Sequence, residues 1–285
     1  MSPGDRCLTK RLTAYTKEVH DEDIRNNESI QLALLVTSRP LYRKAICLFA
    51  ALFKHLESIL ERQKDHTHLG LFHKLLPVIS RADGFQADAS YFLIPSEKGN
   101  KSNDNSKKEE VIPLERSEYL DRLDTLEKED PTRLIAYIFH LYMAVFAGGY
   151  IVKRIVKKAF RLPKDSDEGI QGFSMNNDNA LLVEGERKQM SPKQIRKEMK
   201  RIINEEIAPN LNDKEIQGLM EESLNVFRCN NALAASVSKT AEFEAAKASC
   251  KNFVIIPSLV VLLAIFCASL CKPLTNLSAS TAASA

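Results

Sequence analysis

Apolar side chains recur along this chain at helical spacing rather than at the two-residue spacing of a half-buried strand. The clearest stripe lies in residues 41–60, where a 3.6-residue period predicts one amphipathic helix of about twenty residues. Its members are Leu41, Ala45, Leu48, Phe49, Leu52, Phe53, Leu56, Ile59 and Leu60. No alternating run of β-branched residues competes with this pattern, so the predicted fold is all-α, in a single domain.

Shorter stripes and capping signals mark the other helices. Asp130-Pro131 offers a capping residue followed by a proline at the first helical position, which opens a long apolar helix that Pro163 ends. Asn212 is placed to cap another helix. The predicted helices besides 41–60 are residues 8–19, 119–126, 131–161, 193–207 and 213–233.

Polar stretches separate or follow these helices. Residues 97–110 contain no apolar side chain and are predicted to be a disordered surface loop. Residues 163–192 are predicted to be loop-like, and residues 241–252 are predicted to be a flexible or weakly helical stem. The helical domain is therefore expected to cover residues 1–240.

A long uncharged segment near the C-terminus changes the expected class of protein. Phe253–Cys271 holds nineteen residues without a charge. At ~1.5 Å rise per residue they make about 28 Å of helix, close to the thickness of a bilayer core. Lys251 and Lys272 flank this segment, and the N-terminal residues are too polar for a signal peptide. We expect one C-terminal transmembrane helix at 253–271, acting as a tail anchor with 272–285 as a short luminal tail; a buried core helix is the alternative.

Composition excludes several classes of protein. The chain has 285 residues, with 40 Lys and Arg against 37 Asp and Glu, and this near-balance argues against a nucleic-acid partner, which would require a strong basic excess. Only 10 Gly and 11 Pro exclude collagen-like sequences. The 6 cysteines include no CxxC pair, which excludes a zinc ribbon and a thioredoxin-type redox motif.

Three local features are candidates for a ligand site. His20 lies at the edge of the apolar stripe of the first helix, where an imidazole could ligate iron, although a partly buried structural histidine is the commoner role. Gly148 and Gly149 lie inside the long helix, where each costs roughly 1 kcal/mol relative to alanine, so they either admit a flat ligand or allow close helix packing. Lys197 and Arg201, one turn apart, either bind two carboxylates or form a solvated face.

Together these features resemble the heme oxygenase family. Residues 12–20, Leu-Thr-Ala-Tyr-Thr-Lys-Glu-Val-His, are similar to the family's proximal helix, which ends in the histidine that ligates the haem iron. Residues 142–149, Tyr-Met-Ala-Val-Phe-Ala-Gly-Gly, fall where the family has its distal helix, Tyr-Leu-Gly-Asp-Leu-Ser-Gly-Gly. The likeness spans roughly residues 8–240 and includes the predicted anchor.

The resemblance implies a single multi-helix domain with haem held between the first helix and the long one. His20 would be the axial ligand of the haem iron, and the backbone at Gly148 and Gly149 would cover the opposite face of the haem. The implied haem-contacting side chains are Lys17, Tyr142, Lys197 and Arg201, with Lys17, Lys197 and Arg201 on the propionates.

The resemblance also implies a reaction and its partners. The family cleaves haem, which is both substrate and cofactor, to biliverdin, Fe²⁺ and carbon monoxide with O₂ and with electrons from NADPH-cytochrome P450 reductase. The predicted location is the endoplasmic reticulum membrane, with the domain facing the cytosol. A basic run late in the long helix would dock an acidic reductase face, although a solvated helix end is the default interpretation; it comprises Lys153, Arg154, Lys157 and Lys158.

Two distal positions depart from the family's pattern. Val145 stands where the family has the Asp that orders a proton-delivering water network, and Ala144 stands where it has a Gly. Because an apolar side chain cannot relay a proton, we expect haem to bind and oxygenation to be slow, altered or absent. A non-catalytic haem-sequestering or haem-sensing protein is the first alternative. A tail-anchored, Bcl-2-like interaction protein is the second, although that class usually carries an Asn-Trp-Gly-Arg motif and this chain has no Trp.

Overall fold

The structure is a computed structural model that describes residues 7–19, 35–93, 112–175, 180–183 and 186–250. Helices dominate these residues, as the sequence predicts. The α-helices are α1 (Leu8–Tyr15), α4 (Arg39–Arg62), α5 (Leu69–His73), α6 (Leu76–Ile79), α7 (Ala82–Tyr91), α9 (Leu114–Glu129), α10 (Leu134–Phe160), α11 (Pro192–Arg201), α12 (Asp213–Ser238) and α13 (Ala241–Cys250). Short 3₁₀ turns η1 (Pro131–Arg133), η2 (Gln171–Phe173) and η4 (Ala208–Asn210), a π-helical segment η3 (Ile202–Ile207) and strands β1 (Ala180–Val183) and β2 (Glu186–Gln189) complete the described elements.

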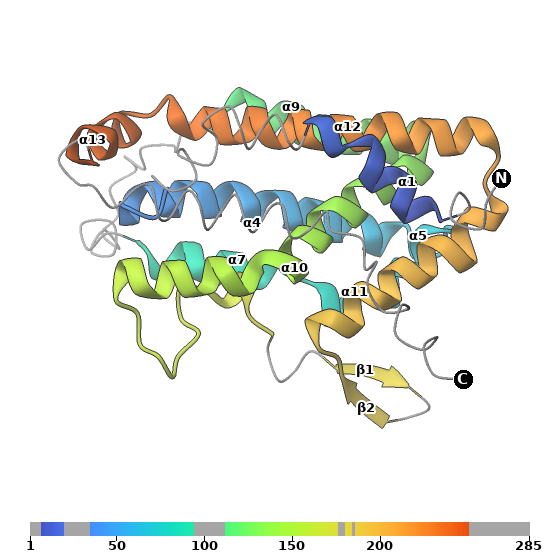
Figure 1. Ribbon diagram of the computed structural model, residues 1–285, viewed down its shortest axis with the longest axis horizontal. Helices are drawn as coiled ribbons and strands as arrows, with labels where there is room; N and C mark the ends of the chain where they lie inside the picture. The colour runs from blue at the N-terminus through green and yellow to red at the C-terminus, as the bar shows by residue number, and fades with distance from the viewer. Residues whose placement is uncertain (1–6, 20–34, 94–111, 176–179, 184–185, 251–285) are drawn as a thin grey trace, which may run out of the picture.

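The three longest helices, α4, α10 and α12, form the body of the bundle. Figure 1 shows α12, α4 and α10 one below another, with α9 beside α12 and α7 beside α4. Helix α1 lies against α12 and the π-helical segment η3. This arrangement brings the start of the chain and the π-helical segment to the same end of the bundle as α11.

Helix α4 confirms the strongest pattern in the sequence. It begins after an extended Ser38, with Pro40 in its first turn, where the missing N–H of proline costs nothing. Its predicted apolar stripe is buried except for Phe49, which is exposed. The long stripe therefore faces the bundle, and burial of that face supplies most of the stability of such a helix.

Helix α10 is the central helix of the domain. Most of its first half is buried, and the helix ends at Arg161, which has a positive φ of 53°. Residues Pro131–Phe160 are the one stretch, among the described residues, that is long and apolar enough to cross a membrane, and 56% of its most apolar window is buried in the domain. Figure 1 shows the labelled part of this helix below α4, and the helix changes direction partway along its length. It is therefore a core helix, and the predicted membrane span at 253–271 lies outside the described residues.

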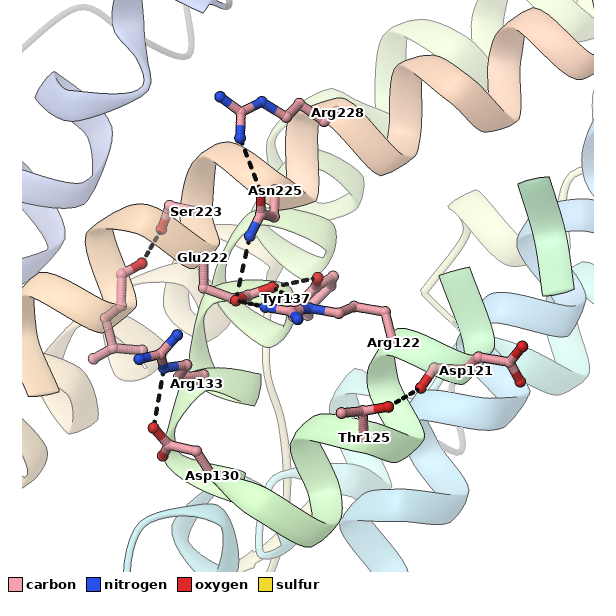
Figure 2. Close-up of polar contacts among 11 residues, drawn as sticks. Asp121, Arg122, Thr125, Asp130, Arg133, Tyr137, Glu222, Ser223, Asn225 and Arg228 are labelled. Carbon is pink, nitrogen blue, oxygen red and sulfur yellow. Dashed lines mark hydrogen bonds and ion pairs between the residues drawn. The ribbon is translucent and has the colours of Figure 1, made fainter. Parts of the chain in front are cut away.

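A buried ion pair ties α9, α10 and α12 together (Figure 2). Glu222 is fully buried and accepts hydrogen bonds from the guanidinium of Arg122, including one from Nε at 3.1 Å, and from the Tyr137 hydroxyl at 2.7 Å. Asn225 adds a longer contact to the same carboxylate at 3.4 Å. Because its oxygens are satisfied by donors from three helices, Glu222 fixes how these helices pack at the side of the bundle that carries α9.

Two predicted helices are interrupted. The predicted helix 8–19 pauses at Thr16, whose hydroxyl donates to the carbonyl of Leu12 at 3.1 Å and so competes with the helical backbone. The predicted helix 193–207 is regular only to Arg201 and continues as the π-helical segment Ile202–Ile207. Neither interruption changes the apolar period enough to be read from the sequence.

Two segments have more regular structure than predicted: residues 163–192 are predicted to be loop-like, and residues 241–252 to be flexible or weakly helical. Within 163–192, β1 and β2 pair antiparallel, with Ala180 opposite Gln189 and Val183 opposite Glu186. Strands of four residues are too short to display a two-residue period, which explains the omission. The predicted stem at 241–252 contains α13, whose Phe243 is buried and whose Glu242 pairs with Lys44 of α4 at 2.9 Å. The predicted loop at 97–110 lies outside the described residues.

Candidate functional site

Helix α10 presents two different faces around its paired glycines. Tyr142, Phe146 and Gly149 are buried, whereas Ala144 is exposed and Val145 is partly exposed. Met143 and Ala147 are also partly exposed. We call the surface formed by the adjacent residues Ala144 and Val145 the open face of α10; Met143 and Ala147 lie on another side of the helix, about 160° from Val145. The side chains of the open face are short and apolar, so a flat apolar molecule can approach the helix there.

The second glycine lies against turn η2. A Cβ added at Gly149 would lie 3.4 Å from Cδ1 and 3.5 Å from Cβ of Phe173, which belongs to this turn. These are ordinary van der Waals distances, so both alternatives raised from the sequence stay open for Gly149. Gly148 is also buried.

Tyr142 points into the core. Its hydroxyl donates to Oε1 of Glu57 at 3.2 Å, and its ring meets Phe53 edge-on at 5.2 Å. Burial raises the pKa of Tyr142 well above its ordinary value, so this phenol stays protonated. The structure therefore places this predicted haem-contacting side chain behind α10, where it supports the helix from the side of α4.

Glu57 is a partly buried carboxylate that the sequence analysis missed. Besides the Tyr142 hydroxyl, its Oε1 accepts the backbone N–H groups of Arg81 at 2.6 Å and Ala82 at 3.1 Å, and Oε2 accepts the Ser80 hydroxyl. Burial raises the pKa of Glu57, while these hydrogen bonds partly offset that effect. Glu57 thus joins α4 to the start of α7 and to α10.

Arg81 extends this buried polar cluster toward the loop that follows α10. Its guanidinium lies 4.9 Å from the ring centroid of Phe146, and it donates to the carbonyls of Ser174 at 2.8 Å and Val78 at 2.9 Å. Burial lowers the pKa of Arg81 to about 10, which still leaves it charged at neutral pH. Phe146 is therefore held between Arg81 and the ring of Tyr142, which stacks on it at 6.2 Å.

The first helix is anchored at its start. The backbone N–H of Thr9 donates to Oδ1 of Asn204 at 3.0 Å, and Nδ2 of Asn204 donates to the Thr9 hydroxyl at 3.0 Å. Lys17 is exposed at the far end of the described part of this segment. His20 lies outside the described residues, so its role as an iron ligand stays a prediction. Among the residues that the structure does describe, no group of three or more His, Cys, Asp or Glu side chains is arranged to hold a metal ion.

The two predicted basic residues of α11, Lys197 and Arg201, have different surroundings. Ile195 and Met199 bury one side of α11, and Lys197 is exposed. Arg201 donates through Nη2 to Glu198 at 2.7 Å and to Glu206 at 2.6 Å. These carboxylates raise the pKa of Arg201 above its ordinary value. A propionate would therefore have to compete with carboxylates of the protein for this guanidinium.

Arg201 also lines a large cavity between α4, the segment 71–83 and the α11–η3 region. The cavity has a volume of about 1140 Å³, and no residue of α1 or α10 lines it. Its charged lining is mixed and includes Lys54, Glu57, His73, Asp83, Glu198 and Arg201. This cavity thus does not join Arg201 to the paired glycines.

Some of the basic side chains late in α10 bind other residues of the domain. Lys153 donates to Asp167 at 2.9 Å and to the Ser174 hydroxyl at 3.1 Å. Lys157 donates to the Lys164 carbonyl at 2.8 Å. Arg154 and Lys158 are exposed. Two of the four predicted docking residues therefore bind within the domain, and two remain displayed on its surface.

Comparisons with known proteins agree on one family. The model of the family described as Heme oxygenase matches residues 6–236. Heme oxygenase 2 of Macaca fascicularis is 26% identical over 176 residues, a region that covers 61% of this chain and only 52% of the relative, so the match spans about half the length of that protein. The crystal structure of heme oxygenase 2 from Chlamydomonas reinhardtii without heme has a TM-score of 0.65 and 26% identity, covering 82% of this chain and 99% of the other. Heme oxygenase-1 from the cyanobacterium Synechocystis, in complex with heme, has a TM-score of 0.66 and 18% identity, covering 86% and 98% of the two chains.

Proposed function

The chain belongs to the heme oxygenase family, and we propose that it binds haem as its substrate and cleaves it oxidatively to biliverdin, Fe²⁺ and carbon monoxide. The observation that carries this proposal is the family match over residues 6–236, together with an all-α fold that places a small-side-chain surface on the central helix. The Bcl-2-like alternative is set aside because the match assigns the chain to a different family.

The open face of α10 fits a flat macrocycle. Ala144 and Val145 present only a methyl and an isopropyl group there, so neither side chain keeps a planar ligand away from the helix. Bound haem would supply the iron that activates O₂ and the porphyrin carbon that is oxidised. In the proposed complex His20 binds the iron, and Lys17, Lys197 and Arg201 receive the propionates. Arg201 exchanges one of its carboxylate partners, Glu198 or Glu206, for a propionate.

We propose that Val145 and Ala144 slow the oxidation. Neither side chain can accept or donate a proton, and the carboxylate that the structure places against this stretch of α10, Glu57, is bonded inside the core. Haem binding without turnover is the second candidate function, and this apolar distal surface is the observation that favours it.

A haem titration tests binding first. Hemin added to the full chain in detergent should give a Soret band that is lost or shifted in His20→Ala and unchanged in His73→Ala, whose partly exposed imidazole lies 3.0 Å from Glu61. Absence of haem binding by the unaltered chain would overturn both candidate functions. NADPH, cytochrome P450 reductase and O₂ then separate them: biliverdin release supports the oxygenase, and a stable haem complex supports the haem-binding protein.

The remaining parts of the proposal concern the membrane and the electron donor. We propose that residues 253–271 anchor the chain in the endoplasmic reticulum membrane, with the helical domain in the cytosol, because the segment is uncharged and flanked by lysines. Arg154 and Lys158 are the exposed cations of α10 that would meet an acidic reductase surface. Fluorescence microscopy of the full chain and of a chain that ends at residue 252 tests the anchor: loss of the reticular pattern in the shorter chain supports it.

A further inference from the structure

The loop that follows α10 returns to pack between α7 and α10. It contains Asp167, the turn η2 and Ser174, and η2 contacts both helices. Lys153 of α10 binds this loop at two points, the Asp167 carboxylate and the Ser174 hydroxyl. Arg81 binds it from the start of α7, through the Ser174 carbonyl. The loop is thus fastened to both helices by charged side chains.

A buried carboxylate of α7 holds the turn itself. Asp88 is fully buried; its Oδ1 accepts the backbone N–H of Gln171 at 2.7 Å and its Oδ2 accepts that of Gly172 at 2.9 Å. Each oxygen therefore has its own backbone donor, an arrangement that only an ionised carboxylate satisfies fully. The sequence analysis did not single out Asp88, because its partners lie 83 and 84 residues further along the chain.

Helix α7 and turn η2 pack so closely that a movement of one displaces the other. A Cβ at Gly172 would lie 2.1 Å from Cδ1 of Phe85, and a Cβ at Gly84 would lie 2.9 Å from the backbone of η2. The last residue of the turn, Phe173, meets Phe85 edge-on at 5.1 Å and lies against Gly149 of α10. A shift of η2 therefore moves Phe173 against α10 at Gly149, which has no side chain to absorb the movement.

We propose that Asp88 is a positioning residue for the open face of α10: by holding η2, it seats Phe173 against Gly149 and so sets where the surface around Ala144 and Val145 stands. The inference rests on the proposed function, since this face is where haem would bind. Asp88 itself is buried in α7, where it binds the backbone of η2, and is not part of the open face.

The electrostatic surroundings make this contact sensitive to pH. Burial raises the pKa of Asp88 to about 7, against the lowering effect of its two backbone donors, and Asp167 of the loop raises it further. Tyr42 of α4 faces Asp88 as a neutral phenol, because burial raises the pKa of Tyr42. Lys153 of α10 is bound to Asp167 and partly compensates its charge. Because the net pKa is raised, the packed carboxyl binds its proton more tightly than an exposed one would, so loss of this proton as pH rises through about 7 weakens the packing of η2 on Asp88.

Hydrogen exchange in the full, haem-free chain in detergent tests the inference. In Asp88→Asn, one backbone donor faces an amide N–H instead of an oxygen, so amides in 170–174 should exchange at least tenfold faster. Peptides covering 142–152 of α10 should lose protection as well, and the haem dissociation constant should rise at least threefold. Asp165→Asn, an exposed aspartate of the same loop, is the matched control and should match the unaltered chain in all three measurements.

The outcomes separate this inference from the proposed function. Failure of the unaltered chain to bind haem would refute the proposed function. The exchange data from the haem-free chain would still show whether Asp88 and η2 affect α10. Faster exchange in 170–174 with unchanged α10 peptides and unchanged haem affinity would overturn the positioning role.

Should Asp88→Asn fail to fold, a pH series on the unaltered chain decides the question. The amide proton shifts of Gln171 and Gly172 and the protection of peptides 142–152, corrected for intrinsic exchange, should change with one shared midpoint near neutral pH. Separate midpoints, or no change in α10, would overturn the inference.

Discussion

Asn204 and Thr9 hold each other through two hydrogen bonds, both 3.0 Å long, that join the π-helical segment to the start of α1. Thr9 lies in the first turn of α1, whose N–H groups have no partner inside the helix. Asn204 therefore acts as a helix cap supplied from 195 residues away in the sequence. The helix predicted to carry the iron ligand is thus positioned by a residue that is distant in sequence but adjacent in space.

Replacement of Asn204 should loosen this helix. Asn204→Ala removes both bonds and should lower the free energy of unfolding by about 1–2 kcal/mol, with a weaker haem affinity because α1 is less well held. Asn204→Asp, which can still accept from the Thr9 N–H, should lose less. Urea unfolding and hemin titration check this, with the exposed Asn210→Ala as control. Equal stability of Asn204→Ala and Asn210→Ala would show that the cap contributes nothing.

Restoring a carboxylate to the open face of α10 should accelerate turnover. Val145→Asp combined with Ala144→Gly supplies a proton acceptor and removes a methyl group beside it, so biliverdin formation should rise by roughly 10²-fold or more if proton delivery limits the reaction. Reductase-coupled assays with matched haem loading measure it. A double variant that binds haem normally yet remains no faster would rule out these two positions as the cause of slow oxidation.

Removing the charge of Glu222 should destabilise the bundle without touching the haem face. Glu222→Gln leaves the Arg122 guanidinium without its buried counter-charge and weakens the bond from Tyr137, at a cost of about 2 kcal/mol, because Arg122 is partly solvated. The urea midpoint should fall, and haem affinity of the folded protein should not change. The neighbouring exposed Glu221→Gln serves as control; a drop of the same size there would remove the case for the buried pair.

The pH dependence of stability should carry a contribution from Asp88. Its pKa in the folded chain is raised from 3.8 to about 7, so the folded state binds a proton more tightly than the unfolded state. The stabilisation linked to Asp88 is therefore complete below its ordinary pKa and is lost as pH rises toward 7, at up to about 1.4 kcal/mol per pH unit. Subtracting the unfolding free energies of Asp88→Asn from those of the unaltered chain between pH 4 and 8 isolates this slope. A difference that stays flat across that window would contradict the raised pKa.

Charge reversal on the displayed end of α10 should impair electron delivery selectively. The variant Arg154→Glu with Lys158→Glu should raise the KM for reductase several-fold at low salt and leave haem affinity unchanged, because both side chains are exposed. Lys214→Glu, an exposed lysine of α12, is the control. Steady-state assays at two ionic strengths measure the effect; the same KM for all three proteins would place the docking surface elsewhere.

Local patterns in the sequence predicted what depends on neighbours along the chain. The apolar period of residues 41–60 identified α4, and Asp130-Pro131 marked the start of the segment that becomes α10. The roles of Glu57, Asp88 and Asn204 escaped notice because each carboxylate or amide finds its partners in another element, and a single buried polar residue leaves no periodic trace. Gly149 shows the same limit, since a glycine pair suits both a ligand and the close approach of Phe173.

The packing of α13 on α4 has a consequence for a chain tethered to lipid. Phe243 and the pair between Lys44 and Glu242 hold the last described helix to the bundle, so the polypeptide leaves the domain from a defined corner. With the proposed anchor in place, the rotation of the domain relative to the membrane would be restricted. A partner diffusing in the same bilayer would meet a restricted set of orientations, and its search for the electron-accepting surface would be confined to two dimensions.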